Sequence, residues 1–158
     1  MPVVFRSSEL EDAVSMSPRL RAADLLECQG LGVEPQAALG GGLGGIECYS
    51  AVSKTTHNVV CMFGIGAQAG GMHPVWLLGT DEMVSSLAYL KAFLRFSKVI
   101  VNDWSRDYGA LGNIVHSDNT VHLRWLESLQ FEIRRDIPYT APSGHTYFPF
   151  TRGAHTDV

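Results

Sequence analysis

The stretch that decides the fold is Pro74–His116, PVWLLGTDEMVSSLAYLKAFLRFSKVIVNDWSRDYGALGNIVH. Its two ends, Pro74–Leu78 and Ala110–His116, are short and apolar, as is typical of buried strands. From Thr80 the apolar spacing changes to near 3.6 residues, which predicts one long helix that ends at Gly109. A strand, helix, strand passage favours a right-handed crossover and places the two strands parallel.

Residues at the start of this helix and along one of its faces support its assignment. Thr80 is a suitable N-cap, and Asp81 and Glu82 would place negative charge in the first turn, where the helix dipole favours it. We expect the helix to bury one apolar face, made of Leu87, Leu90, Leu94, Val101 and Trp104.

The residues before this unit predict helices followed by a strand meander. Ile46–Val52 and Asn58–Ile65 are rich in β-branched and aromatic residues, so with Pro74–Leu78 they predict three antiparallel strands. Apolar spacing predicts a helix over Asp12–Cys28. The sequence also predicts a short helix over Pro35–Leu39 and a flexible connector at the glycine run Gly40–Gly45.

After the unit we expect one more helix and a strand. Ser117, Asp118 and Asn119 can each cap a helix whose shared face is Val121, Trp125 and Leu129. Tyr147–Phe150 is a further strand candidate. The expected organisation is one α/β domain over residues 1–150 and a C-terminal tail over residues 151–158.

Composition and charge limit the classes of binding partner that we expect. The chain has 158 residues, 46% of them hydrophobic, and a net charge of −4 with scattered basic residues, so neither nucleic acid nor an anionic membrane surface is favoured. No apolar run approaches the roughly 20 residues of a membrane span. Three cysteines favour reduced core residues in a cytoplasmic protein, and the histidine spacing indicates no metal site.

Three stretches carry a family resemblance. The first is His116–Phe131, HSDNTVHLRWLESLQF, and the others are Pro74–Asp81, PVWLLGTD, and Pro18–Glu27, PRLRAADLLE. Taken in their order along the chain, they resemble the internal virion (core) protein A family of short-tailed, T7-like bacteriophages. The closing segment, with Asn119 opening a helix and an aromatic at Trp125, is also similar to that of the Gcn5-related N-acetyltransferases (GNAT).

The resemblance implies a fold and a role. The fold would be GNAT-like, with an antiparallel meander, a long crossover helix, a splayed parallel strand and a short C-terminal helix. The role would be in virion assembly or genome ejection, with other virion proteins or its own copies as partners. The protein would then be located in the virion, and in the host cytoplasm during assembly.

The resemblance also defines where acetyl-coenzyme A would bind. Active acetyltransferases hold its pyrophosphate with an Arg/Gln-x-x-Gly-x-Gly/Ala loop before the long helix, and here Leu78, Gly79 and Thr80 stand at that place, with Asn119 and Trp125 as further candidate cofactor residues. The loop has a single glycine and is followed by two carboxylates, which would repel a pyrophosphate.

The residues at the expected active site decide whether the protein could be an enzyme. Trp125 stands where active members often have a tyrosine general acid, and an indole cannot supply that proton. Glu47, Glu82 and His116 are the candidate general bases. The sequence therefore favours a non-catalytic protein without a cofactor. The first alternative is an N-acetyltransferase that uses acetyl-coenzyme A on an amine of a host protein or small molecule. The second is a host-directed binding protein with an exposed apolar patch.

Overall fold

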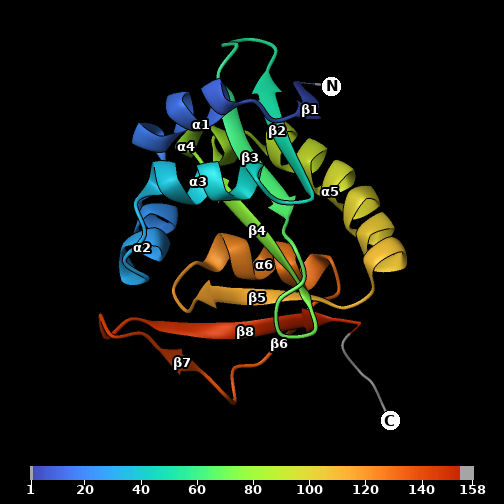
Figure 1. The fold of residues 1–158 in the computed structure, drawn as a ribbon. Helices are drawn as coiled ribbons and strands as arrows, with labels where there is room; N and C mark the ends of the chain where they lie inside the picture. Colours follow the sequence, from blue (N-terminus) through green and yellow to red (C-terminus); the bar gives the residue numbers. More distant parts are fainter. Residues whose placement is uncertain (1, 154–158) are drawn as a thin grey trace.

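The computed structural model describes residues 2–153, and in this part of the chain eight strands form one mixed sheet (Figure 1). They cross the sheet in the order β1-β2-β3-β4-β5-β8-β6, and β7 also pairs with β8. Their bounds are Val3–Ser7 (β1), Glu47–Ser53 (β2), Val59–Ile65 (β3), His73–Gly79 (β4), Leu111–His116 (β5), Glu132–Ile133 (β6), Tyr139–Thr140 (β7) and Thr146–Arg152 (β8).

The predicted meander and crossover are confirmed. Strands β1 to β4 are antiparallel to their neighbours, while β4 and β5 are parallel. The parallel register has only two pairs, His73 with Leu111 and Pro74 with Gly112, so the two strands separate toward their carboxyl ends. Strand β8 then pairs with β5 along six residues and covers its other edge.

Helices pack on both faces of the sheet. Side chains alternate along β3, so Phe63 and Ile65 face one hydrophobic cluster and Met62 faces another. The first cluster contains α5 (Leu87–Tyr108) and α6 (Thr120–Ser128), and the second contains α1 (Leu10–Met16), α2 (Ala22–Gly30) and α3 (Pro35–Leu43). The core therefore has two layers, one on each side of the sheet.

The single helix predicted over residues 12–28 is wrong. The chain forms α1, a 3₁₀ turn η1 (Ser17–Arg19) and then α2. Pro18 lies in the first positions of the 3₁₀ turn, where its missing N–H costs no helical hydrogen bond. Leu20 is extended and bridges to Thr80, so the chain changes direction before α2 begins.

The predicted glycine connector is partly helical, because α3 continues from Pro35 to Leu43. Its Gly42 packs directly against the indole of Trp76, and a Cβ at this position would overlap the ring. The glycine is required by this close approach between α3 and β4, which composition alone does not reveal.

The long crossover helix is interrupted near its start. A short helix α4 (Asp81–Val84) precedes α5, and the side chain of Ser86, not of Thr80, caps the longer helix by accepting from the N–H groups of Ala88 and Tyr89. The predicted buried face is correct at Val101 and Trp104 but wrong at Leu87 and Leu94, which are exposed. In the first half of α5 the side chains that pack inward are Ala92 and Phe93 instead.

The C-terminal strand is longer than predicted. Gly109 ends α5 with a positive φ, and Asn119 caps α6, both as expected. Thr151 and Arg152, assigned to the tail, belong to β8, where Arg152 also donates to the carbonyl of Leu129. The remaining tail residues 154–158 lie outside the described residues. Sequence reasoning also missed the N-terminal strand β1 and the two-residue strands β6 and β7.

Candidate functional site

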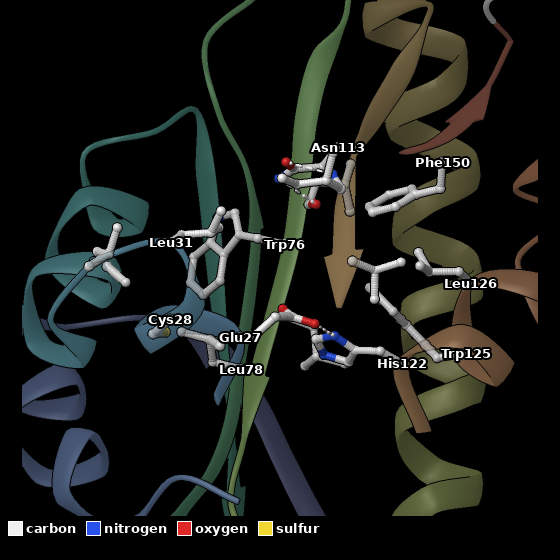
Figure 2. A pocket seen from close by; sticks show the side chains of 16 residues that line it. Glu27, Cys28, Leu31, Trp76, Leu78, Asn113, His122, Trp125, Leu126 and Phe150 are labelled. Atoms are coloured by element: carbon white, nitrogen blue, oxygen red, sulfur yellow. Dashed lines mark hydrogen bonds and ion pairs between the residues drawn. The ribbon is translucent and has the colours of Figure 1, made fainter. Parts of the chain in front are cut away.

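A cavity of about 210 Å³ lies where β4 and β5 separate, and we call it the passage (Figure 2). Because its lining comes from both faces of the sheet, the passage crosses the sheet between the α2–α3 side and the α6 side. Its apolar walls include Cys28, Leu31, Ala38, Trp76 and Leu78 on the first side and Trp125, Leu126 and Phe150 on the second.

Glu27 of α2 and His122 of α6 point toward each other in the passage (Figure 2). His122 Nδ1 lies 3.4 Å from Glu27 Oε1, and the two side chains are only 5% and 14% exposed. Burial alone would raise the pKa of Glu27, but the charge of His122 and several hydrogen bonds hold this pKa below its ordinary value. Burial opposes a charged His122, yet the carboxylates of Glu27 and Asp24 raise its pKa above the ordinary 6.5.

Asp24 is fully buried next to this pair. Its Oδ2 accepts from the backbone N–H of Gly79 at 2.9 Å and from Arg21 at 3.0 Å, and its Oδ1 accepts from the Asn119 amide at 2.9 Å. His122 Nε2 lies 3.7 Å away. Two positive and two negative side chains thus form a buried, charge-balanced group, as buried charges require.

The two α2 carboxylates bind the ends of both separated strands. Asp24 accepts from Gly79, the last residue of β4, and Glu27 accepts from the N–H of His116, the last residue of β5, at 3.1 Å. We call Asp24 and Glu27 the carboxylate clamp. Asn119 donates to both carboxylates, so α6 is tied to the clamp as well.

The predicted cofactor residues lie here, but their donors are already used. Leu78 lines the passage, and the N–H of Gly79 binds Asp24. Thr80 donates both its backbone N–H and its hydroxyl to the carbonyl of Val60, at 3.0 and 2.8 Å. These N–H groups, where a pyrophosphate was expected, are satisfied by the protein itself. The donors of Gly79 and Thr80 are therefore not free to hold a phosphate of acetyl-coenzyme A.

Trp125 closes the α6 side of the passage. Its Nε1 donates to the hydroxyl of Ser97 at 3.1 Å, and the ring packs near Phe93. Trp125 and Leu77 also line a second cavity between α5 and α6, so they lie between the two cavities. The indole is a buried wall whose single donor is already bound.

The three predicted general bases are not brought together. Glu47 accepts from the hydroxyls of Tyr49 and Tyr108, and Glu82 accepts from Thr56 and Asn58 in the β2–β3 turn. Neither lines the passage.

His116 lies at the end of β5 and is engaged by its own neighbours. Its Nδ1 accepts from the N–H of Asp118, so its Nε2 is the donor in the 2.8 Å bond to Nδ1 of His145. This arrangement leaves no ring nitrogen of His116 for a substrate.

Sequence reasoning missed Asp24, Glu27 and His122. One signal was present, since Asp24 and Glu27 are three residues apart and therefore share a helix face, as do Asn119 and His122. Apart from Arg21, the groups that the Asp24 and Glu27 side chains contact are 55 to 98 residues distant, so no local pattern connects them.

The described residues contain neither a metal cluster nor a membrane helix. Between residues 2 and 153, no three His, Cys, Asp or Glu side chains are arranged to hold a metal ion. No helix in this range is both long and apolar enough to cross a bilayer.

Comparison with solved structures identifies the fold. The chain is similar to a GNAT-family acetyltransferase from Bacillus anthracis, with a TM-score of 0.66 and 11% identity over 96% of this chain and 95% of that one. The ribosomal-protein-S5-alanine acetyltransferase of Vibrio fischeri has a TM-score of 0.60 and 11% identity, over 100% and 97% of the two chains. The aminoglycoside acetyltransferase AAC(6')-Ib, solved with coenzyme A, has a TM-score of 0.61 and 12% identity, over 96% and 95%.

The predicted fold class is therefore confirmed: the chain has a mixed α/β, GNAT-like fold over nearly its whole length. Identities this low show the fold alone, and a fold does not define an activity. No protein-family model matches the sequence, and no curated protein matches it. The resemblance to the internal virion protein A family stays a prediction.

Proposed function

We propose that the protein is a non-catalytic domain on an acetyltransferase fold, which serves virion assembly or genome ejection in a T7-like bacteriophage. The observation that carries the non-catalytic part is the bond from the Gly79 N–H to Asp24, because this donor lies at the expected cofactor loop. A cofactor phosphate there would have to displace a buried carboxylate that also neutralises Arg21.

Electrostatics around the loop argue in the same direction. Asp24 contacts the loop through the N–H of Gly79, and Asp81 and Glu82 follow the loop in the sequence. A pyrophosphate would meet three carboxylates, while Arg21 is already paired. Anion sites at helix N-termini depend on unpaired N–H groups, and Ser86 already satisfies two at the start of α5.

The virion role rests on the resemblance of the three sequence stretches described above. A domain whose Gly79 and Thr80 donors are bound within the protein can act as a scaffold. Its proposed partners are other virion proteins and its own copies. Its proposed location is the virion, and the host cytoplasm during assembly.

Isothermal titration of acetyl-coenzyme A into the purified protein tests the non-catalytic part. A Trp125→Tyr variant examines the aromatic wall alone, and AAC(6')-Ib serves as a positive control because it was solved with coenzyme A. We expect no saturable heat with the wild type or the variant. Saturable micromolar binding by the wild type would overturn the proposal.

The virion part needs a separate measurement. Mass spectrometry of density-purified particles from the encoding phage should detect the protein at a fixed ratio to the capsid protein. Particles made without the gene should be defective in assembly or in delivering DNA. If complete, fully infectious particles form without it, the virion role is wrong.

The alternative is an N-acetyltransferase that uses acetyl-coenzyme A on an amine of a host protein or small molecule. The passage favours it, because an open cavity crosses the sheet and has a Glu–His pair inside it. The ion pair argues against it, because the carboxylates of Glu27 and Asp24 raise the pKa of His122 and so favour its protonated form, which cannot accept a proton from an amine.

A further inference from the structure

An apolar groove lies on the opposite side of Trp125 from the passage, between α5 and α6. Its volume is about 280 Å³, and we call it the α5–α6 groove. Leu87 and Leu94 of α5 line it and are 66% and 38% exposed. Exposed apolar surface gathered in a groove is typical of an interaction site.

The groove also carries unpaired positive charge. Lys91 and Arg124 line it, and within residues 2–153 neither forms an ion pair. Arg95 and Lys98 are exposed on the same helix. Because the chain as a whole has a charge of −4, this basic surface is local. An occupant should therefore combine apolar side chains with negative charge.

The described chain itself presents such a segment at α1. Leu10 and Val14 are 67% and 50% exposed, and they lie one turn apart on the helix. Glu9 and Glu11 are exposed beside them. Arg6 on the neighbouring strand is already paired with Asp12, so it does not cancel the two glutamates.

Helix α1 cannot reach the groove of its own molecule. It packs on α3 and β3 in the second hydrophobic cluster, whereas α5 and α6 belong to the first, across the sheet (Figure 1). A contact between α1 and the groove must therefore join two molecules.

We propose that the α5–α6 groove binds α1 of a second copy of this chain. Leu10 and Val14 of one copy cover Leu87 and Leu94 of the next, while Glu11 approaches Lys91 and Arg124. The two surfaces are different, so the contact is head-to-tail and produces rings if it closes or open chains if it does not. This inference does not depend on whether the protein binds acetyl-coenzyme A.

A charge swap tests this pairing. Sedimentation velocity should show the wild-type mass rising from that of a 17.3 kDa monomer as concentration increases. Glu11→Lys places like charges across the contact from the α1 side, and Lys91→Glu does so from the groove side. Each variant alone should associate about tenfold more weakly than the wild type.

Sedimentation of an equal mixture of the two variants is the decisive measurement. In the mixture, α1 of the Glu11→Lys variant meets the groove of the Lys91→Glu variant with opposite charges. The unchanged α1 and the unchanged groove also match, so association should return. Glu34→Lys and Lys54→Glu are controls with the same charge changes at exposed positions outside the groove and α1, and they should associate like the wild type.

Apolar variants complete the test. Leu10→Ser and Leu87→Ser change exposed side chains, so circular dichroism should show native folding while association falls about tenfold. A wild type that stays monomeric at millimolar concentration would overturn the inference. So would charge-swap variants that associate no better together than apart.

Discussion

Replacing Asp24 with alanine removes the acceptor that holds the expected cofactor loop to α2. The change leaves Arg21, with 9% side-chain exposure, and His122, with 5%, as buried cations without this carboxylate, and leaves the Gly79 N–H without its acceptor. Removing one partner of a buried ion pair costs about 3–5 kcal/mol. This is a large share of the roughly 5–15 kcal/mol that stabilises a domain.

The assay is thermal and urea unfolding followed by circular dichroism. For a domain of this size about 2–4 °C of Tm is lost per kcal/mol, so Asp24→Ala should lower Tm by about 6–20 °C. Asp81→Ala is the matched control, because this carboxylate is exposed and supplies at most about 1 kcal/mol through the helix dipole.

Asp24→Asn gives a second measurement if the alanine variant does not fold. Its amide oxygen can still accept from Gly79 but cannot neutralise Arg21, so its loss of stability should lie between those of Asp24→Ala and the wild type. An Asp24→Ala protein within about 1 kcal/mol of the wild type would refute the clamp as a structural element.

Two further predictions concern the buried pair and the glycine run. The pKa of His122 is raised by folding, so its contribution to the unfolding free energy is fully present below the ordinary pKa of 6.5 and is lost as the pH rises through the folded pKa. The pKa of Glu27 is lowered by folding, so its contribution is present above the ordinary pKa of 4.5 and is lost as the pH falls through the folded pKa. The difference in unfolding free energy between wild type and His122→Gln should therefore be largest between pH 4.5 and 6.5, and a pH-independent difference would contradict this. Gly42→Ala should destabilise by about 1–3 kcal/mol because its Cβ overlaps Trp76, whereas Gly41→Ala has open space and should stabilise by about 0.5–1 kcal/mol. Urea unfolding of the two glycine variants decides this, and equal effects would contradict it.

The sheet could be predicted because its signals are local. The strands of the meander and the helix between β4 and β5 follow from apolar spacing and from Gly109. Helix ends were less predictable, since Pro18 and Ser86 break continuous apolar patterns through backbone hydrogen bonds that spacing does not record.

The site was only partly predictable. The loop at Gly79 and the wall at Trp125 could be located from their positions along the fold. The carboxylate clamp could not, because Asp24 and Glu27 look like ordinary surface charges on a helix until α6 and the strand ends approach them. Buried charges depend on distant partners, so only the folded chain reveals them.

The occupied Gly79 donor is the central claim, and amide NMR tests it most directly. We predict that the Gly79 and Thr80 amide signals do not move when acetyl-coenzyme A is added in excess, and that Asp24→Asn shifts the Gly79 signal without any cofactor. A saturable shift of both signals in the wild type on adding acetyl-coenzyme A would contradict the account and make the protein an acetyltransferase candidate.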